Sequence, residues 1–225
     1  MTWVKICGTT NLEDALVAVE AGADAVGFVF YEKSPRNISV EAAREIVKEL
    51  PEGVEKVGVF VDADCERIRA VVLDVGLTAV QLHGKRALDG VWEDTRPAAE
   101  CVGVSKVIPM IPGNALKGGG IMISERVHEK TFAILIDAQV NGASGGMGTT
   151  FDWEATHEMV QALSLSMPVI VAGGLTGSNV GEAMSLFHPF GVDVVSGVEA
   201  TPGKKDPEKV RAFVKAVREI DRKVS

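Results

Sequence analysis

The stretch VGVFV at residues 57–61, followed by a helical pattern over residues 64–73, decides the fold of this chain. A short apolar run rich in β-branched residues is typical of a strand that is buried on both faces. A helix that follows such a strand directly completes one β/α unit of a parallel sheet. The same succession recurs from one end of the chain to the other.

Eight runs of this type predict strands at residues 4–7, 25–30, 57–61, 79–82, 103–108, 132–137, 169–172 and 193–196. Helical patterns lie at residues 12–21, 40–50, 64–73, 85–101, 125–130, 153–163, 178–187 and 206–222. Capping residues precede several of these helices, among them Asn11, Ser39 and Asp206. The segment 85–130 is the least regular, because Pro109, Pro112 and a run of glycines interrupt it.

Eight β/α units without a linker predict an α/β protein with a single domain over residues 1–225, a (β/α)8 TIM barrel. An open doubly wound sheet is the alternative. That fold usually carries GxGxxG after its first strand, whereas here the first strand runs into CGTTN.

Composition and charge exclude several classes of protein. The chain has 225 residues, of which 46% are hydrophobic and 24% charged, and these values exclude a disordered chain or a collagen-like fibre. A net charge of −8 does not favour binding to nucleic acid or to an anionic membrane. No apolar run approaches the roughly 18 residues of a membrane span. Three cysteines without a CxxC pair favour reduced thiols. We expect a cytoplasmic monomer or homodimer that binds no nucleic acid and no membrane.

Polar residues at the carboxyl ends of the strands are the candidates for an active site in a barrel of this type. Alternation places Lys5 and Cys7 on one side of the first strand, and Gln81 and His83 on one side of the fourth. If the residues between them face the helices, all four side chains face the barrel mouth.

Cys7 has two interpretations. A free cysteine is often a small buried hydrophobe. The catalytic interpretation requires a thiolate, which Lys5 nearby would favour. Lys5 has a structural interpretation of its own, an inward-facing ion pair such as one with Asp193, and we prefer it.

Asp137 ends an apolar strand, where an acid is costly unless it is solvated, hydrogen-bonded or functional. The structural alternative is a turn or N-cap carboxylate. A glycine-rich loop at residues 142–148 follows it and lacks the Gly-Lys-Ser/Thr ending of a Walker sequence. We therefore favour a catalytic Asp137 and interpret the loop as a lid.

Glycines follow two neighbouring strands: Gly173 and Gly174 after the seventh, and Gly197, next to Ser196, after the eighth. Barrel enzymes commonly bind phosphate at these ends through backbone N–H groups. Tight turns would explain either site alone. Together they predict a phosphorylated small-molecule substrate.

Arg36 lies in the polar loop after the second strand, and its planar guanidinium suits a carboxylate. From its position alone, a solvated surface arginine is the more common case. The histidines show no metal-ligand spacing such as HxH or HExxH, so we expect no metal.

The motifs keep a fixed order along the chain: KICG at residues 5–8, SPR at 34–36, QLHG at 81–84, LID at 135–137, FDW at 151–153, AGGL at 172–175 and SGVE at 196–199. This set closely resembles the phosphoribosylanthranilate isomerase family of tryptophan biosynthesis. The resemblance implies a (β/α)8 barrel that converts N-(5-phosphoribosyl)anthranilate to 1-(2-carboxyphenylamino)-1-deoxyribulose 5-phosphate by an Amadori rearrangement, without a cofactor.

Carried over residue by residue, the resemblance implies Cys7 as general base, Asp137 as general acid and Arg36 as partner of the anthranilate carboxylate. It assigns substrate binding to the remaining candidates, Gln81, His83, Gly173, Gly174, Ser196 and Gly197. The chain departs from the family at Thr149, where lysine is common, and at Val195, where serine is usual.

Two rival functions stay open. Another phosphosugar isomerase or epimerase would keep the phosphate glycines, but the isomerase of histidine biosynthesis typically has aspartate at the position of Cys7, and the epimerase carries metal ligands. A non-catalytic barrel that binds a phosphate ligand would need neither Cys7 nor Asp137.

Overall fold

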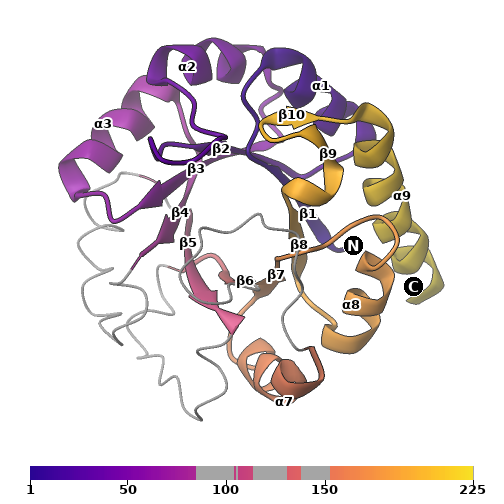
Figure 1. Ribbon diagram of the computed structural model, residues 1–225. Helices are drawn as coiled ribbons and strands as arrows, with labels where there is room; N and C mark the ends of the chain where they lie inside the picture. Colours follow the sequence, from indigo (N-terminus) through magenta and orange to yellow (C-terminus); the bar gives the residue numbers. More distant parts are fainter. Residues whose placement is uncertain (85–103, 105, 114–130, 138–152, 225) are drawn as a thin grey trace.

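The computed structural model describes residues 1–84, 104, 106–113, 131–137 and 153–224. Within them, eight parallel strands close a barrel in the order β1 to β8, with β8 paired back to β1 (Figure 1). The strands are β1 (Trp3–Cys7), β2 (Ala25–Val29), β3 (Glu55–Val61), β4 (Ala79–His83), β5 (Lys106–Pro112), β6 (Ile134–Asp137), β7 (Val169–Val171) and β8 (Gly191–Val194). Closure of the sheet confirms the predicted (β/α)8 barrel and excludes the open doubly wound sheet.

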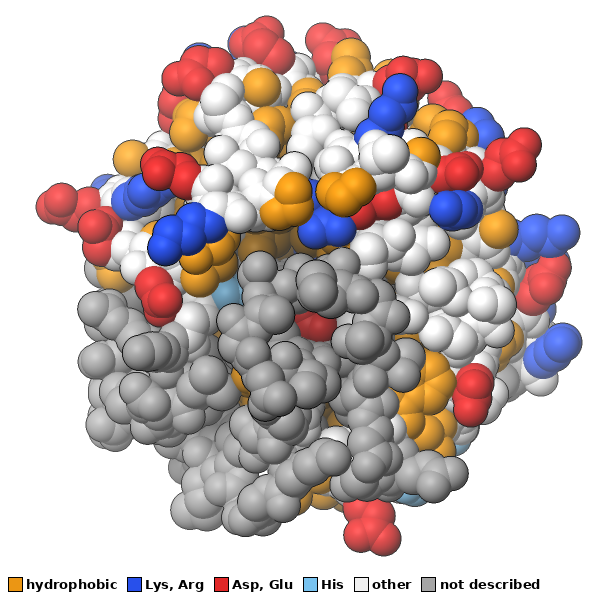
Figure 2. Space-filling model, in the orientation of Figure 1, with side chains coloured by type: hydrophobic (Ala, Val, Ile, Leu, Met, Phe, Trp, Pro, Cys, Tyr) orange, Lys and Arg blue, Asp and Glu red, His pale blue; other side chains and the backbone are white. Residues whose placement is uncertain are grey.

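Helices surround the ring of strands on its outer side (Figure 1). They are α1 (Leu12–Ala21), α2 (Val40–Glu49), α3 (Cys65–Val75), α7 (Trp153–Ser164), α8 (Val180–Phe187) and α9 (Pro207–Val224). Acidic and basic side chains are interspersed around the described part of this face (Figure 2). None of the helices in the described residues combines the length and the hydropathy of a membrane span.

Side chains along the strands alternate between two cores. The core between the barrel and the helices includes Ile6, and Leu82 packs against it. A second core fills the ring itself; it consists of Ala25, Val57, Ala79, Ile108, Met110, Ala133, Leu135, Ile170 and Ala172. Lys5 and Cys7 are buried and share the inward side of β1, as the alternation predicts.

The helix boundaries follow the capping residues. The Asn11 side chain accepts a hydrogen bond from the Asp14 N–H, and α1 begins and ends at the predicted residues. Ser39 caps α2 in the same way, and Asp206 accepts hydrogen bonds from the N–H groups of Glu208 and Lys209. The caps therefore define where these helices start.

Two predicted strands are displaced. β5 covers Lys106–Pro112 instead of residues 103–108. It continues through Pro109 and Pro112 because proline has a φ angle that a strand accepts, although each proline removes one N–H donor. β8 covers Gly191–Val194 instead of residues 193–196, because Ser196 starts a short 3₁₀ helix, η3 (Ser196–Val198). The predicted helices at residues 85–101 and 125–130 and the predicted lid lie outside the described residues.

A hairpin that the sequence did not predict follows η3. Its strands are β9 (Glu199–Thr201) and β10 (Lys204–Lys205), paired antiparallel. The hairpin lies between α1 and α9 on the face seen in Figure 1, and the Lys205 N–H donates to the Asp14 carboxylate of α1 at 2.7 Å. It therefore ties the chain after β8 to the chain after β1.

The two ends of the chain meet on the outside of the barrel. The Thr2 N–H donates to the Asp221 carboxylate at 3.0 Å, and the Thr2 hydroxyl donates to it at 2.7 Å. Arg218 of α9 donates to the Asp24 carboxylate at 2.8 Å. These contacts hold the last helix against the first strand and the start of the second.

Candidate active site

One cavity opens at the carboxyl ends of the strands and has an empty volume of about 770 Å³, which includes space open to solvent. Its walls come from seven of the eight strands, all except β5, or from the loops directly after them. The lining residues are Cys7, Val29, Tyr31, Ser34, Arg36, Val59, Val61, Gln81, His83, Asp137, Ala172, Gly173, Gly174, Leu175, Asp193, Val194, Val195 and Ser196. The structure thus brings every predicted site residue except Gly197 to one cavity.

Cys7 ends β1 at the wall of this cavity, opposite Gly27 of β2 in the parallel register. A Cβ atom on Gly27 would lie 2.6 Å from the Cys7 sulfur and 3.1 Å from Cε of Lys5. The missing side chain of Gly27 therefore leaves the space in which the thiol and the lysine lie side by side.

Lys5 forms a buried ion pair, with its Nζ atom 2.8 Å from Oδ1 of Asp193, and its side chain is 0% exposed. Burial lowers the pKa of Lys5, but the charges of Asp193 and Cys7 outweigh that effect and leave its pKa above the ordinary value. The preferred interpretation of Lys5 is confirmed.

The pairing with Asp193 changes what Lys5 does for Cys7. Burial raises the pKa of the Cys7 thiol, and the Lys5 ammonium lowers it without cancelling the effect of burial, so the pKa lies above the usual thiol value. Lys5 therefore favours the thiolate, as expected, but burial of the thiol and the charge of Asp193 outweigh this effect on the pKa.

We predict that Asp193→Asn destabilises the fold by about 3–5 kcal/mol, since it leaves the Lys5 ammonium buried without a counter-charge. Urea unfolding at neutral pH measures this loss. As a matched control, Asp74→Asn removes the partner of Arg44 in an exposed pair, which should cost about 0–1 kcal/mol. Equal losses for the two variants would contradict the prediction.

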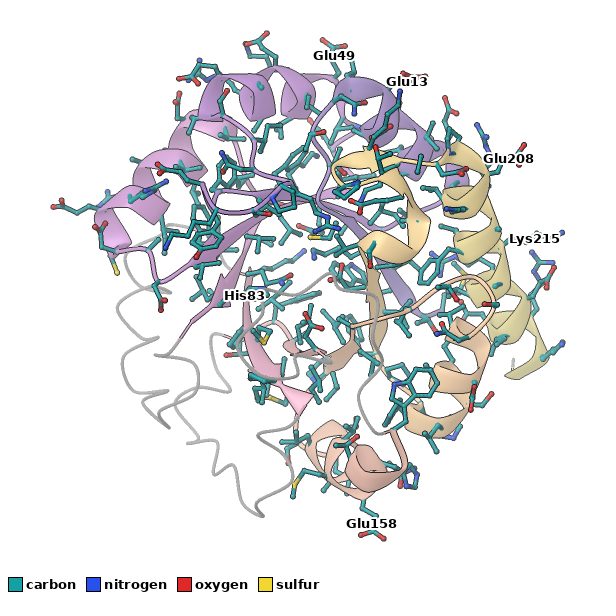
Figure 3. The ribbon with its side chains drawn as sticks, in the orientation of Figure 1. Glu13, Glu49, His83, Glu158, Glu208 and Lys215 are labelled. Carbon is teal, nitrogen blue, oxygen red and sulfur yellow. The ribbon has the colours of Figure 1, made fainter. Side chains whose placement is uncertain are left out.

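His83 and Gln81 project from β4 into the same cavity. Nε2 of His83 lies 2.5 Å from Nε2 of Gln81, whereas the Gln81 Oε1 atom is buried without a protein partner among the described residues. Figure 3 shows His83 beside the ring, while the labelled residues Glu13, Glu49, Glu158, Glu208 and Lys215 point outward. Burial lowers the pKa of His83 to about 4, and the Lys5 charge acts in the same direction.

The lowered pKa of His83 predicts that acid weakens the fold. The unfolded chain binds a proton at His83 near pH 6.5 and the folded chain only near pH 4, so the contribution of His83 is complete above pH 6.5 and is lost as the pH falls to about 4. The loss amounts to at most about 3 kcal/mol. Urea unfolding of wild type and His83→Asn at pH 7 and pH 4.5 measures it. Between pH 7 and pH 4.5 the free energy of unfolding should fall more for wild type than for His83→Asn. An equal fall in the two proteins would contradict the assignment.

Arg36 is buried, with 7% of the residue exposed, so the solvated surface arginine that its position favoured is wrong. Its Nε and Nη2 atoms donate to Oε1 and Oε2 of Glu199 at 2.8 and 2.7 Å. Glu199 also accepts from the buried Lys205, whose Nζ atom lies 3.1 Å from Oε1. Sequence reasoning missed Glu199 and Lys205 as site residues; the only signal was that Glu199 ends the SGVE motif.

Gly173 and Gly174 turn the chain after β7 with φ angles of 91° and 64°, a region that favours glycine. The Asn179 side chain fastens this turn by donating to the Gly174 carbonyl at 3.0 Å. Ser196 lines the cavity next to them. The two glycines and Ser196 can therefore present backbone N–H groups to an anion.

Gly197 lies in a different setting. A Cβ atom there would come within 1.8 Å of the Leu175 carbonyl oxygen, and Gly197 is not among the residues that line the cavity. Close packing of η3 on the loop after β7 explains the need for glycine at this position. Substitution of Gly197 would disturb the fold before it tested an anion site.

A closed (β/α)8 barrel whose mouth holds a thiol, a carboxyl group and paired glycines defines a barrel enzyme of the phosphosugar class. The chain matches the family model described as N-(5'phosphoribosyl)anthranilate (PRA) isomerase over residues 4–216. The N-(5'-phosphoribosyl)anthranilate isomerase of Pseudomonas fluorescens is 43% identical over 215 residues, 95% of this chain and 97% of that protein. The chain belongs to the N-(5'-phosphoribosyl)anthranilate isomerase family, which confirms the resemblance of its motifs.

Solved structures of this family are similar to the chain throughout. The crystal structure of phosphoribosyl anthranilate isomerase from Thermotoga maritima is 42% identical, with a TM-score of 0.80, and the match covers 97% of this chain and 100% of that one. A second structure, of the isomerase in complex with reduced 1-(o-carboxyphenylamino)-1-deoxyribulose 5-phosphate, is 42% identical with a TM-score of 0.76 and the same coverage.

Proposed function

We propose that this chain converts N-(5-phosphoribosyl)anthranilate to 1-(2-carboxyphenylamino)-1-deoxyribulose 5-phosphate with Cys7 as general base and Asp137 as general acid. The chain is an isomerase of the aldose–ketose type in tryptophan biosynthesis, as its family membership establishes. The observation that carries the two assignments is that Cys7, at the end of β1, and Asp137, at the end of β6, line one cavity.

The proposed reaction requires an acid and a base on the same sugar. The Asp137 carboxyl group gives its proton to the furanose ring oxygen; the bond from C1′ to that oxygen breaks, and the nitrogen lone pair forms a C1′=N iminium ion. The Cys7 thiolate then removes the proton on C2′. The electrons of that C–H bond form C1′=C2′, and the iminium electrons return to nitrogen, which gives the enolamine. The iminium ion is the electron sink, so the chemistry calls for no cofactor.

The same cavity supports the assignment of the binding residues. Backbone N–H groups around Gly173, Gly174 and Ser196 suit the substrate phosphate, because fixed amide dipoles bind anions without a charged side chain. The guanidinium of Arg36 suits the anthranilate carboxylate. Gln81 and His83 line the wall of the cavity and complete the set of proposed substrate contacts.

The rival functions differ from this one in chemistry. A phosphate-binding barrel without catalysis leaves the convergence of Cys7 and Asp137 on one cavity unexplained. The isomerase of histidine biosynthesis typically carries aspartate where this chain has Cys7. A single domain over residues 1–225, the oligomeric state, the absence of a metal and the cytoplasmic location stay predictions.

The direct test is the assay of the purified protein with phosphoribosylanthranilate generated in situ, because this substrate is labile. Loss of anthranilate-type fluorescence follows the conversion, and identification of the carboxyphenylamino-deoxyribulose phosphate confirms the product. Release of free anthranilate alone, at the rate seen without protein, would overturn the proposed reaction.

A further inference from the structure

Arg36, Glu199 and Lys205 form a triad of buried charged side chains, of which Arg36 lines the cavity. Each of the three residues is at most 7% exposed. Arg36 donates two parallel hydrogen bonds to the Glu199 carboxylate at 2.7 and 2.8 Å, and Lys205 approaches the same carboxylate from β10. Two parallel N–H···O bonds fix the plane of a guanidinium as well as its position.

The hairpin β9–β10 holds Glu199 in place. The Gly203 N–H, in the turn of the hairpin, donates to Oε1 of Glu199 at 3.2 Å, and the Gly203 carbonyl accepts from the Thr10 hydroxyl at 2.6 Å. Lys205 also donates to the Val195 carbonyl at 3.3 Å. Glu199 is therefore held by the N–H of Gly203 in the hairpin turn and by the Lys205 side chain, and Thr10 fastens that turn to the loop after β1.

The stem of Arg36 runs beside the proposed catalytic strand. A Cβ atom on Gly8, the residue after Cys7, would lie 2.7 Å from Cδ of Arg36. The glycine of the KICG motif thus makes room for Arg36. Its guanidinium is held from one side by Glu199, and Arg36 and Cys7 line the same cavity.

We propose that Glu199 is a positioning residue, which occupies one edge of the Arg36 guanidinium so that the other edge is presented to the carboxylate of the substrate. This inference rests on the proposed function, in which Arg36 binds that carboxylate. Glu199 uses Nε and one N–H of Nη2, and a guanidinium has a second edge, formed by Nη1 and Nη2, that can hold another carboxylate.

The charges of the triad support the same role. Arg36 and Lys205 share the single carboxylate of Glu199, and a buried charge is costly unless it is paired. A carboxylate on the aromatic end of the substrate, separate from its phosphate, would give the Arg36 guanidinium a second partner.

The test compares two product-like ligands in wild type and in Glu199→Gln. One ligand is reduced 1-(o-carboxyphenylamino)-1-deoxyribulose 5-phosphate, and the other is the same compound without the ring carboxylate. Glutamine keeps one acceptor for Arg36 but sets an amide NH₂ against its second donor, so the guanidinium loses its fixed plane. We expect affinity for the carboxylate ligand to fall about 10- to 100-fold, with affinity for the other ligand unchanged.

Three further variants make the test selective. Glu208→Gln makes the same chemical change on the exposed face of α9 and should leave both affinities unchanged (Figure 3). Glu199→Asp keeps the charge but withdraws the carboxylate by one methylene, so it should give an intermediate loss for the carboxylate ligand only. In an Arg36→Lys background, Glu199→Gln should cause no additional loss.

The outcomes separate this inference from the proposed function. If wild type binds the two ligands equally, the carboxylate contact of Arg36 fails and the inference fails with it. If wild type discriminates between the ligands and the folded Glu199→Gln or Glu199→Asp variant keeps that ratio, the positioning role alone is overturned. Equal weakening of both ligands would likewise overturn it and mark Glu199 as a general support of the fold.

Discussion

Cys7→Ser should lower kcat by about 10² to 10⁴-fold while the protein still binds the product nearly normally. A hydroxyl is a far weaker base than a thiolate, yet serine has the same shape and fits the space beside Gly27. Steady-state kinetics and product titration measure the two effects. Cys65→Ser provides the matched control, because Cys65 lies on the outer helix α3 and not in the cavity, and its replacement should leave kcat unchanged.

The environment of Cys7 adds a pH dependence to this prediction. Its raised pKa means that the free protein carries a thiol at neutral pH, so kcat/KM of wild type should increase with pH up to and beyond the ordinary thiol range. The increase should be absent in Cys7→Ser. Near-normal turnover by this variant would remove Cys7 from the mechanism.

Asp137→Asn should lower kcat by about 10² to 10⁴-fold. The amide has no proton to give to the ring oxygen, so ring opening should become the slow step. Rate measurements across the pH range for wild type and variant test this, with Asp74→Asn on the surface as the control.

A wild-type rate in Asp137→Asn would place the acid elsewhere. His83 is another titratable residue of the same cavity, but a pKa of about 4 leaves its imidazole neutral at pH 7 and therefore a poor acid. The structure therefore favours Asp137 over His83 as the general acid, and the activity of Asp137→Asn tests this assignment.

Local signals in the sequence predicted the helices that lie within the described residues. Asn11 caps α1 through its own side chain and Gly22 ends it in a left-handed conformation, so both boundaries depend on residues adjacent to the helix. The predicted position of β5 was wrong because we took Pro109 and Pro112 to interrupt regular structure. Proline does so in a helix, but β5 contains both prolines. The hairpin β9–β10 was missed because its strands are only three and two residues long, too short for any periodicity.

Some features of the candidate site could be predicted from the sequence, and others could not. Cys7, Gln81 and His83 were predictable because alternation along a strand fixes the side to which a residue points. The burial of Arg36 was not predictable, since its partner Glu199 lies 163 residues away in the sequence. The ion pair of Lys5 with Asp193 was predicted, but the direction of the Cys7 pKa was not, because its largest cause is burial of the thiol, which only the closed barrel shows.

The contacts between Thr2 and Asp221 and between β1 and β8 bear on how the protein is made. During synthesis the first strand leaves the ribosome with one edge open, and its partner on that side, Gly191–Val194, follows almost a whole chain length later. The helix that supplies Asp221 and Arg218 emerges later still. At about 5–20 residues per second the nascent protein therefore spends on the order of ten seconds or more with an unpaired edge, the period in which chaperones have most to protect.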